Sequence, residues 1–369
     1  MDPELQIAHS VTEIGAEAWD SLSEGRPFSS YRWYVFGESV LVNCPPTYLV
    51  FRDGKTPVAR AAFWLKRQEW LPIASKSVRA WAERLLEQRP LFVCETPLAC
   101  MPGLILPELT GRTAILQKIA QTAHELAKQS RTLCALFSYI KREEATHTDW
   151  PKNYAAISYS DAETSLQISW TDYESYIKHL AKSTRRNIRL HCKEADEMGI
   201  TIKVDSSTTA LDEAVTLVQN VETHHRVGHR PWTRAMLQNA HLVDSRWISA
   251  WIGDRLVGCC SLLSDGTAQT ATLLGLDYEL SQWIYVYYQL IYAVVRCAIE
   301  SGCRELYGGG GAYELKRRLG FKVLPDDYMV LAPTGWMSAF LWKGSARLMN
   351  ALKKPDSNQA SGDNPENPI

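Results

Sequence analysis

The chain has 369 residues, of which 46% are hydrophobic and 22% are charged, and its formal net charge at pH 7 is −1. This length suffices for two domains with full cores, and the balanced charge excludes a protein built around a global positive field for DNA. The first residues, MDPELQIAHS, lack the basic start and apolar run of a secretory signal, so we expect a cytoplasmic protein.

The first half of the chain, residues 1–163, predicts one α+β domain. Apolar residues at helical spacing, clearest over residues 112–129, alternate with short stretches rich in β-branched and aromatic residues. We expect helices over residues 13–21, 30–43, 77–88 and 112–129, and strands over residues 47–52, 56–66, 68–71, 91–94 and 133–139. Asp53 and Gly54 form the expected turn between two paired strands.

The large aromatic residues of this half are expected in the core rather than in a pocket, at Trp33, Trp64, Trp70 and Trp81. Arg60 and Lys66 project from a predicted strand. Two interpretations of these basic side chains stay open: they reach a cleft shared by the two halves, or they lie on a solvated face.

The second half, residues 164–330, opens with a strand over residues 166–169 and one long helix over residues 173–198, closed by Gly199. Basic residues follow one side of this helix at steps of three and four, at Lys178, Lys182, Arg185, Arg186, Arg189 and Lys193. Such a ridge favours an anionic partner, such as a pyrophosphate or an RNA backbone, which arginine binds in bidentate fashion. A solvated helix face is the alternative.

A histidine-rich segment, HHRVGHRPW, follows a strand over residues 200–204 and a helix over residues 209–225. No carboxylate or cysteine accompanies it at metal-ligand spacing, so we predict no metal site. His225 is instead a candidate proton acceptor. Three antiparallel strands over residues 246–252, 255–264 and 267–275 and a buried helix over residues 283–299 come next.

The stretch CRELYGGGGAYELKRRLGFK, residues 303–322, predicts a strand over residues 304–307, a bare turn and a helix over residues 312–319. Gly308, Gly309, Gly310 and Gly311 remove every Cβ, so a ligand can approach the backbone closely. The N–H groups at the start of a helix favour an oxygen that gains negative charge. Lys316 lies too far beyond the last glycine for a Walker loop, so we do not expect ATP binding.

The order of these elements resembles the acyltransferase fold of the GNAT superfamily. Two motifs, Arg185 to Arg189 (RRNIR) and Gly310 to Phe321 (GGAYELKRRLGF), are similar to those of its FemAB-like and CelD-like branch. The resemblance implies an α+β protein with two GNAT-like domains of mixed, mostly antiparallel sheets flanked by helices. The first domain would be a degenerate copy.

The resemblance also implies an N-acyltransferase that moves an acyl or aminoacyl group from an activated ester or thioester to an amine. Lys316 would hold donor phosphate or stabilise developing charge, and Tyr313 would either donate a proton or be an ordinary core tyrosine. The glycines of residues 308–311 would line the site, and Arg185, Arg186 and Arg189 would bind anionic substrate. No cofactor is expected to stay bound.

The donor and acceptor stay open. Coenzyme A-dependent members of the superfamily carry a glycine-containing loop after the fourth strand, whereas this chain has DYELSQWIYVYY from Asp277. The co-substrate is therefore acyl-coenzyme A or an aminoacyl-tRNA, and a non-catalytic binding module is a third interpretation. The acceptor would be a small molecule or a cell-envelope precursor.

The C-terminal segment, residues 331–354, predicts an amphipathic helix, clearest over residues 336–352 (WMSAFLWKGSARLMNAL). Docking on the body of the protein or peripheral contact with a membrane surface would bury its apolar face. Residues 355–369 are rich in Ser, Asn, Gly and Pro, which predicts disorder.

Overall fold

The computed structural model describes residues 3–68, 76–107, 111–147, 149–158, 162–225, 228–280, 283–325 and 327–335. The predictions for Trp70, the strand at residues 68–71, the helix at 336–352 and the tail at 355–369 lie outside these residues or largely so. Within the described residues, no helix has the length and apolar character that crossing a bilayer requires.

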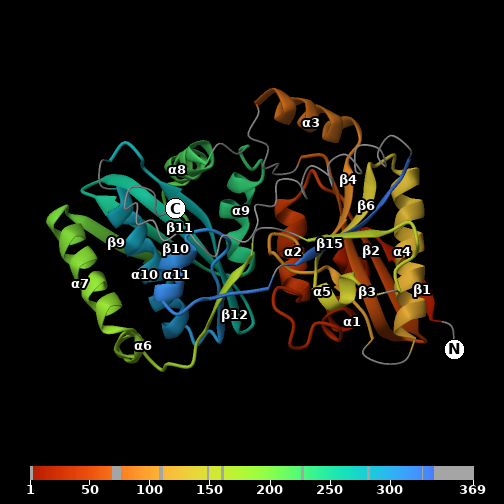
Figure 1. The fold of residues 1–369 in the computed structure, drawn as a ribbon, viewed down its shortest axis with the longest axis horizontal. Coiled ribbons are helices and arrows are strands. Elements are labelled where there is room, and N and C mark those ends of the chain that lie inside the picture. The colour runs from red at the N-terminus through yellow and green to blue at the C-terminus, as the bar shows by residue number, and fades with distance from the viewer. Residues whose placement is uncertain are drawn as a thin grey trace.

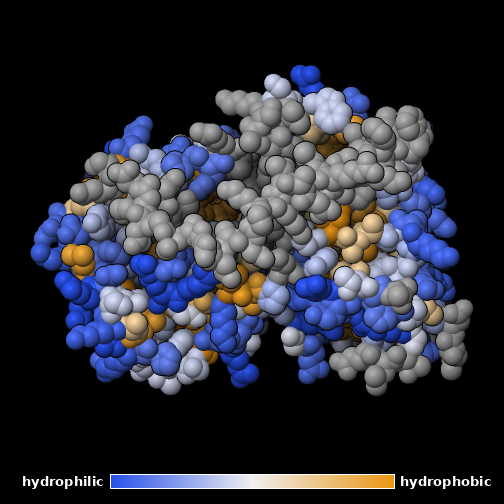
Figure 2. All heavy atoms as spheres, viewed as in Figure 1, coloured by the Kyte–Doolittle hydropathy of each residue, from blue (hydrophilic) through white to orange (hydrophobic). Residues whose placement is uncertain are grey.

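Two mixed sheets, each flanked by helices, lie side by side (Figure 1). This arrangement confirms the predicted α+β fold with two GNAT-like halves. In the space-filling view, hydrophilic residues cover the outer sides of both halves, and hydrophobic colour appears mainly towards the middle of the molecule (Figure 2).

The first sheet has the strand order β1-β2-β3-β4-β6-β15-β7 among the described residues, with β5 paired to β3. Its pairs are antiparallel except β4 with β6. The strands are β1 (Glu4–Ala8), β2 (Pro46–Asp53), β3 (Thr56–Lys66), β4 (Leu91–Cys94), β5 (Leu104–Ile105), β6 (Cys134–Ile140), β7 (Ala155–Ser158) and β15 (Tyr328–Pro333). The helices of this half are α1 (Ala16–Asp20), α2 (Tyr31–Val40), α3 (Lys76–Gln88), α4 (Arg112–Gln129) and α5 (Arg142–Ala145).

The second sheet has the order β14-β8-β13-β12-β11-β10-β9, in which β12 and β13 run parallel. Its strands are β8 (Thr164–Gln167), β9 (Ile200–Asp205), β10 (Asp244–Ile252), β11 (Arg255–Asp265), β12 (Ala268–Leu276), β13 (Glu305–Tyr307) and β14 (Lys322–Val323). The helices are α6 (Tyr173–His179), α7 (Lys182–Glu197), α8 (Leu211–His224), α9 (Thr233–Asn239), α10 (Trp283–Glu300) and α11 (Tyr313–Arg318).

The long basic helix predicted over residues 173–198 is in fact two helices. Leu180 and Ala181 are extended, with ψ near 150°, and they separate α6 from α7. No proline or glycine marks this break in the sequence. Leu180 is buried in the core of the second half, and Arg185 donates hydrogen bonds to the carbonyls of Lys178 and Leu180 at the break. Tertiary packing therefore overrides helix propensity here.

The chain returns to the first sheet after completing the second. β14 closes the second sheet against β8, and β15 then inserts between β6 and β7 of the first sheet. The sequence placed everything up to residue 330 in the second half, whereas residues 328–333 complete the first. Helical and strand periodicity identifies a strand but not the sheet that it joins.

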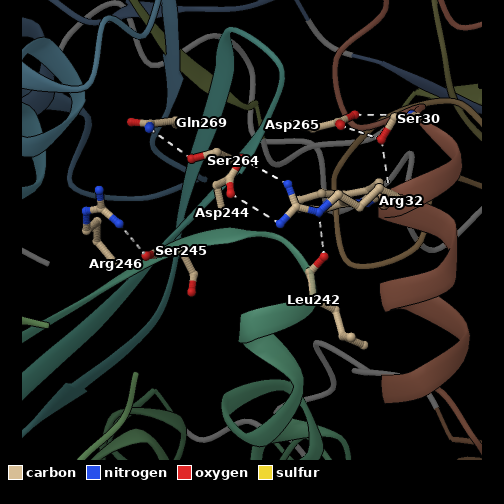
Figure 3. A network of polar contacts seen from close by, with 10 residues as sticks. Ser30, Arg32, Leu242, Asp244, Ser245, Arg246, Ser264, Asp265 and Gln269 are labelled. Atoms are coloured by element: carbon tan, nitrogen blue, oxygen red, sulfur yellow. Dashed lines mark hydrogen bonds and ion pairs between the residues drawn. The ribbon is translucent and has the colours of Figure 1, made fainter. Parts of the chain in front are cut away.

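The two halves share one hydrophobic core, because buried residues of both belong to a single cluster. The ring of Phe28 meets that of Tyr307 edge-on at 5.5 Å. Polar contacts continue the interface (Figure 3). Arg32 of α2 pairs with Asp244 at 3.0 Å and donates to the Leu242 carbonyl at 2.7 Å, while the backbone N–H of Ser30 donates to Asp265 at 3.2 Å.

The aromatic and basic residues of the first half divide between core and surface. Trp33 and Trp64 are fully buried, as predicted, but Trp81 of α3 is 55% exposed, so its predicted core position is wrong. Arg60 is 1% exposed and reaches neither a cleft nor the solvent. Its guanidinium donates to the carbonyls of Trp19 and Ser29 and lies 3.8 Å from the Trp19 ring, so it supports the core.

Candidate active site

The strands β12 and β13 part where the predicted site begins. They pair in parallel only from Ala268 with Glu305 to Thr270 with Tyr307. β12 continues to Leu276, whereas the other chain segment turns into the four glycines. The two segments therefore diverge beyond Thr270 and Tyr307, and a gap opens between them.

A bulge in β12 lies in this gap. Cys259 faces Gly275 and Ser261 faces Thr272, so Leu273 and Leu274 together oppose Cys260. Leu273 takes a left-handed φ of +52°, which is uncommon for a branched side chain. A bulge interrupts the ladder of a strand and re-aims its backbone groups, so β12 presents irregular backbone to the gap.

Lys316 of α11 holds the opposite wall together. Its side chain is buried, and its Nζ donates to the carbonyls of Gly308, Gly309 and Gly310 at 2.8, 3.0 and 3.1 Å. A lysine ammonium has three N–H donors, so the glycine loop uses all of them. The family resemblance implies that Lys316 holds donor phosphate or stabilises developing charge, whereas its hydrogen-bond partners in the structure are the loop carbonyls.

Burial lowers the pKa of Lys316 to about 8, because desolvation disfavours the charged form, while the nearby charge of Glu163 acts in the opposite direction. The pKa of Glu163 is raised, mainly by burial and despite a hydrogen bond from the backbone N–H of Thr164 at 2.8 Å. A partly buried carboxyl group and a buried amine therefore lie together beside the glycine loop.

A substitution at Gly309 can test whether the conformation of the glycine loop matters for activity. Gly309 has a φ of +74° and open space around the position of a Cβ, and Gly253 in the β10–β11 turn is similar at +58°. We expect Gly309→Ala and Gly253→Ala each to lower the free energy of unfolding by about 1–2 kcal/mol, the cost of a left-handed alanine. Only Gly309→Ala should lower turnover, by about tenfold or more, because it disturbs the site. Equal turnover in the two variants would show that the loop conformation does not matter.

A cavity of about 1650 Å³ joins this gap to the first half of the molecule. The second half contributes Thr270–Leu274 of β12, the glycines and Lys316. The first half contributes the segment Val40–Cys44 and Lys66. The Nζ of Lys66 lies 2.5 Å from Oε1 of Glu95, in an ion pair that is mostly shielded from solvent. Both halves therefore build the site.

Comparison with protein families gives two matches. Residues 182–317 match an acetyltransferase (GNAT) domain, and residues 10–249 match the FemAB-like family, described as peptidoglycan biosynthesis/recognition. The second match covers more than half of the chain. The protein belongs to the FemAB-like family. Members of the GNAT and FemAB-like families are acyl or aminoacyl transferases.

Solved structures share the fold of this FemAB-like protein. FemX aligns with a TM-score of 0.58 at 10% identity, over 92% of this chain and all of its own. A tandem GNAT protein from the clavulanic acid biosynthesis pathway has a TM-score of 0.54 at 12% identity, over 90% and 99% of the two chains. The C-terminal domain of a putative lysylphosphatidylglycerol synthetase from Agrobacterium fabrum has a TM-score of 0.52 at 10% identity, over 92% and 98%. A comparison with curated proteins finds no match.

Among the other predicted site residues of the FemAB-like protein, His225 lines the cavity and Tyr313 does not appear in its wall. The pKa of His225 is lowered, first by partial burial and then by the neighbouring His224. The hydroxyl of Tyr313 donates to the Ala162 carbonyl at 3.0 Å, which favours the structural interpretation of this residue.

The basic ridge lies apart from the cavity. α7 occupies the far edge of the second half (Figure 1), and neither Arg185, Arg186 nor Arg189 lines the cavity. Arg185 is used to join α6 and α7, whereas Arg186 and Arg189 are exposed. The two terminal lysines of the ridge are paired with acidic residues just outside it, Lys178 with Glu174 and Lys193 with Glu197.

The acidic residues of the cavity, among them Glu95, Glu163 and Glu222, were not predicted from the sequence. Glu95 and Glu163 lie outside any periodic segment, and nothing in their local sequence marks them. Glu222 could have been found, because it follows Val218 by four residues on the inward face of a predicted helix. An acidic residue in an apolar stripe is a signal of a buried charge.

Proposed function

We propose that this protein is an N-acyltransferase that moves an acyl or aminoacyl group from an activated ester or thioester to an amine. The parting of β12 and β13 beside the cavity carries this proposal. A carbonyl group bound in the gap would meet the irregular backbone of β12 on one side and the glycine loop on the other. Backbone N–H groups aimed at a developing oxyanion are a strong source of catalysis.

The protein residues would position groups rather than form covalent bonds. The amine nitrogen would attack the carbonyl carbon, the bond to the ester oxygen or thioester sulfur would break, and the leaving group would take up a proton. Lys316 would act through the glycine loop as a positioning residue. His225, with its lowered pKa, would be neutral near pH 7 and could accept the proton that the amine loses.

The loop after β12 corresponds to the loop with which coenzyme A-dependent members of the superfamily bind their donor. Its residues here favour a different donor. Asp277 and Glu279 lie in this loop, and both carboxylates face Arg255, with an Arg255–Glu279 distance of 3.4 Å. A phosphate group would have to compete with these acids for that arginine. Together with the FemAB-like family, this supports an aminoacyl-tRNA donor and a cell-envelope precursor as acceptor. Arg186 and Arg189 are exposed and could contact the RNA backbone.

Two measurements can identify the donor: the shift in the melting temperature of the protein when a donor binds, and the transfer of a labelled group from that donor. We expect an aminoacyl-tRNA to raise the melting temperature more than acetyl-coenzyme A or a long-chain acyl-coenzyme A, because a ligand that binds the folded state stabilises it. Transfer of a labelled aminoacyl group should stop after RNase treatment and weaken steeply with salt. RNase-resistant transfer from an acyl-thioester would identify the other donor class. Binding of either donor without transfer to any amine would support a non-catalytic module.

A further inference from the structure

Glu222, on the last turn of α8, is a buried acidic residue in the wall of the cavity. Its side chain is 2% exposed. Oε1 accepts hydrogen bonds from the backbone N–H and from Nη1 of Arg230, both at 3.2 Å. Oε2 has no hydrogen-bond donor within reach among the described residues. One half of the carboxylate is thus satisfied and the other half is not.

An unsatisfied buried carboxylate oxygen is costly for the folded protein. Buried polar atoms in native proteins nearly always have a partner, and an exception calls for an explanation. The other buried residues of α8, Ala214, Leu217 and Val218, are apolar, and a residue of that kind at position 222 would avoid the cost. The retained carboxylate therefore points to a ligand that supplies the missing donor.

The charge of the cavity indicates the kind of donor. Its described wall includes six acidic residues, at Glu83, Glu87, Glu95, Glu163, Glu222 and Asp327. It includes four basic residues that are not histidine, at Lys66, Arg67, Arg230 and Lys316. Three of the acidic residues are ion-paired, Glu95 with Lys66, Glu222 with Arg230 and Asp327 with Lys141. The remaining excess of acidic groups is small, and its sign favours a cationic ligand. A cation with N–H groups would satisfy both the charge and the hydrogen-bond requirement.

We infer that Oε2 of Glu222 binds the ammonium group of a primary-amine acceptor. This inference rests on the proposed function, which requires an amine in the same cavity. α8 packs on β12, because a Cβ on Gly275 would lie only 2.8 Å from the Cβ of Leu217. The turn that carries Glu222 follows directly, and His225, the residue that caps α8, lies three residues later and lines the same cavity. A bound ammonium would therefore lie near the candidate proton acceptor.

The inference can be tested with simple amines in the full-length protein. We would compare n-butylammonium, tetramethylammonium and 1-butanol at equal concentration and matched ionic strength, measuring melting temperature. For the wild type we expect a rise of about 2 °C or more with n-butylammonium. Tetramethylammonium has the charge without N–H groups and 1-butanol has a donor without the charge, so both should have smaller effects.

Two variants locate the effect. Glu222→Gln keeps the shape and the contact with Arg230 but removes the charge, and it should abolish the n-butylammonium shift. Glu87→Gln removes an exposed carboxylate of the same cavity and should keep the shift. If Glu222→Gln does not fold, Glu222→Asp, which retracts the carboxylate by one methylene group, should reduce the shift.

Three results would overturn the inference: no shift in the wild type, an equal shift in Glu222→Gln, or equal shifts with both cations. These results are separable from the test of the proposed function. Donor transfer without n-butylammonium binding would refute the role of Glu222 alone. Binding that depends on Glu222, without transfer from any donor, would refute the enzyme and leave an amine-binding site.

Discussion

Replacement of Lys316 by methionine is expected to lower turnover by about 100-fold, because a displacement of about 1 Å in a catalytic site can have an effect of that size. Methionine fills a similar volume but cannot donate a hydrogen bond. The carbonyls of Gly308, Gly309 and Gly310 would lose their shared partner, and the loop would relax. Donor transfer under saturating conditions is the measurement.

Lys322→Met is the matched control for this variant. Lys322 lies six residues later and is exposed, so its replacement should leave turnover unchanged. Leaving the loop carbonyls unsatisfied should also lower the stability of Lys316→Met, and activity must therefore be measured well below its melting temperature. Turnover close to wild type in folded Lys316→Met would remove Lys316 from the site.

Turnover at alkaline pH should also depend on the protonation state of Lys316. Its pKa of about 8 means that the ammonium loses a proton as the pH rises through that value. The neutral amine has one donor fewer for the loop. We expect turnover to fall above pH 8, approaching about tenfold per pH unit if only the ammonium form is active. In Lys316→Met this limb of the profile should be absent.

The contribution of Lys316 to stability should rise over the pH range in which turnover falls. The ordinary lysine pKa of 10.5 is lowered in the folded protein, so between about pH 8 and 10.5 the unfolded chain binds more protons. The contribution of Lys316 to the free energy of unfolding must then rise with pH. The difference in that free energy between wild type and Lys316→Met, measured by urea denaturation, should show this slope. A flat difference would contradict the lowered pKa.

Local elements were largely predictable. The helix α4 and the strands β3 and β4 have the bounds that the sequence predicts, because their apolar periodicity is strong and glycine, proline or polar turns bound them. The family motifs also led to the GNAT fold. The turn of four glycines, which the sequence predicts between a strand and a helix, lines the cavity of the candidate site.

Contacts between distant segments were not predictable in the same way. The sequence predicts a continuous basic ridge because it predicts one helix over residues 173–198, and only the packing of Leu180 reveals the break between α6 and α7. Lys316 looked free to bind a phosphate, because its distance to the glycine carbonyls depends on how α11 folds back on the loop. The place of Glu222 in an apolar stripe is a sequence signal of burial, but its contact with Arg230 and its place in the cavity wall come only from the structure.

By itself, the sequence determined the α+β class, most helices and strands, the glycine turn and the family, because these depend on residues close together in the chain. Only the tertiary structure decided that β15 returns to the first sheet and that both halves line one cavity. It also decided which charged groups are buried there. These features depend on burial and on contacts between residues far apart in the chain, and local periodicity carries no information about either.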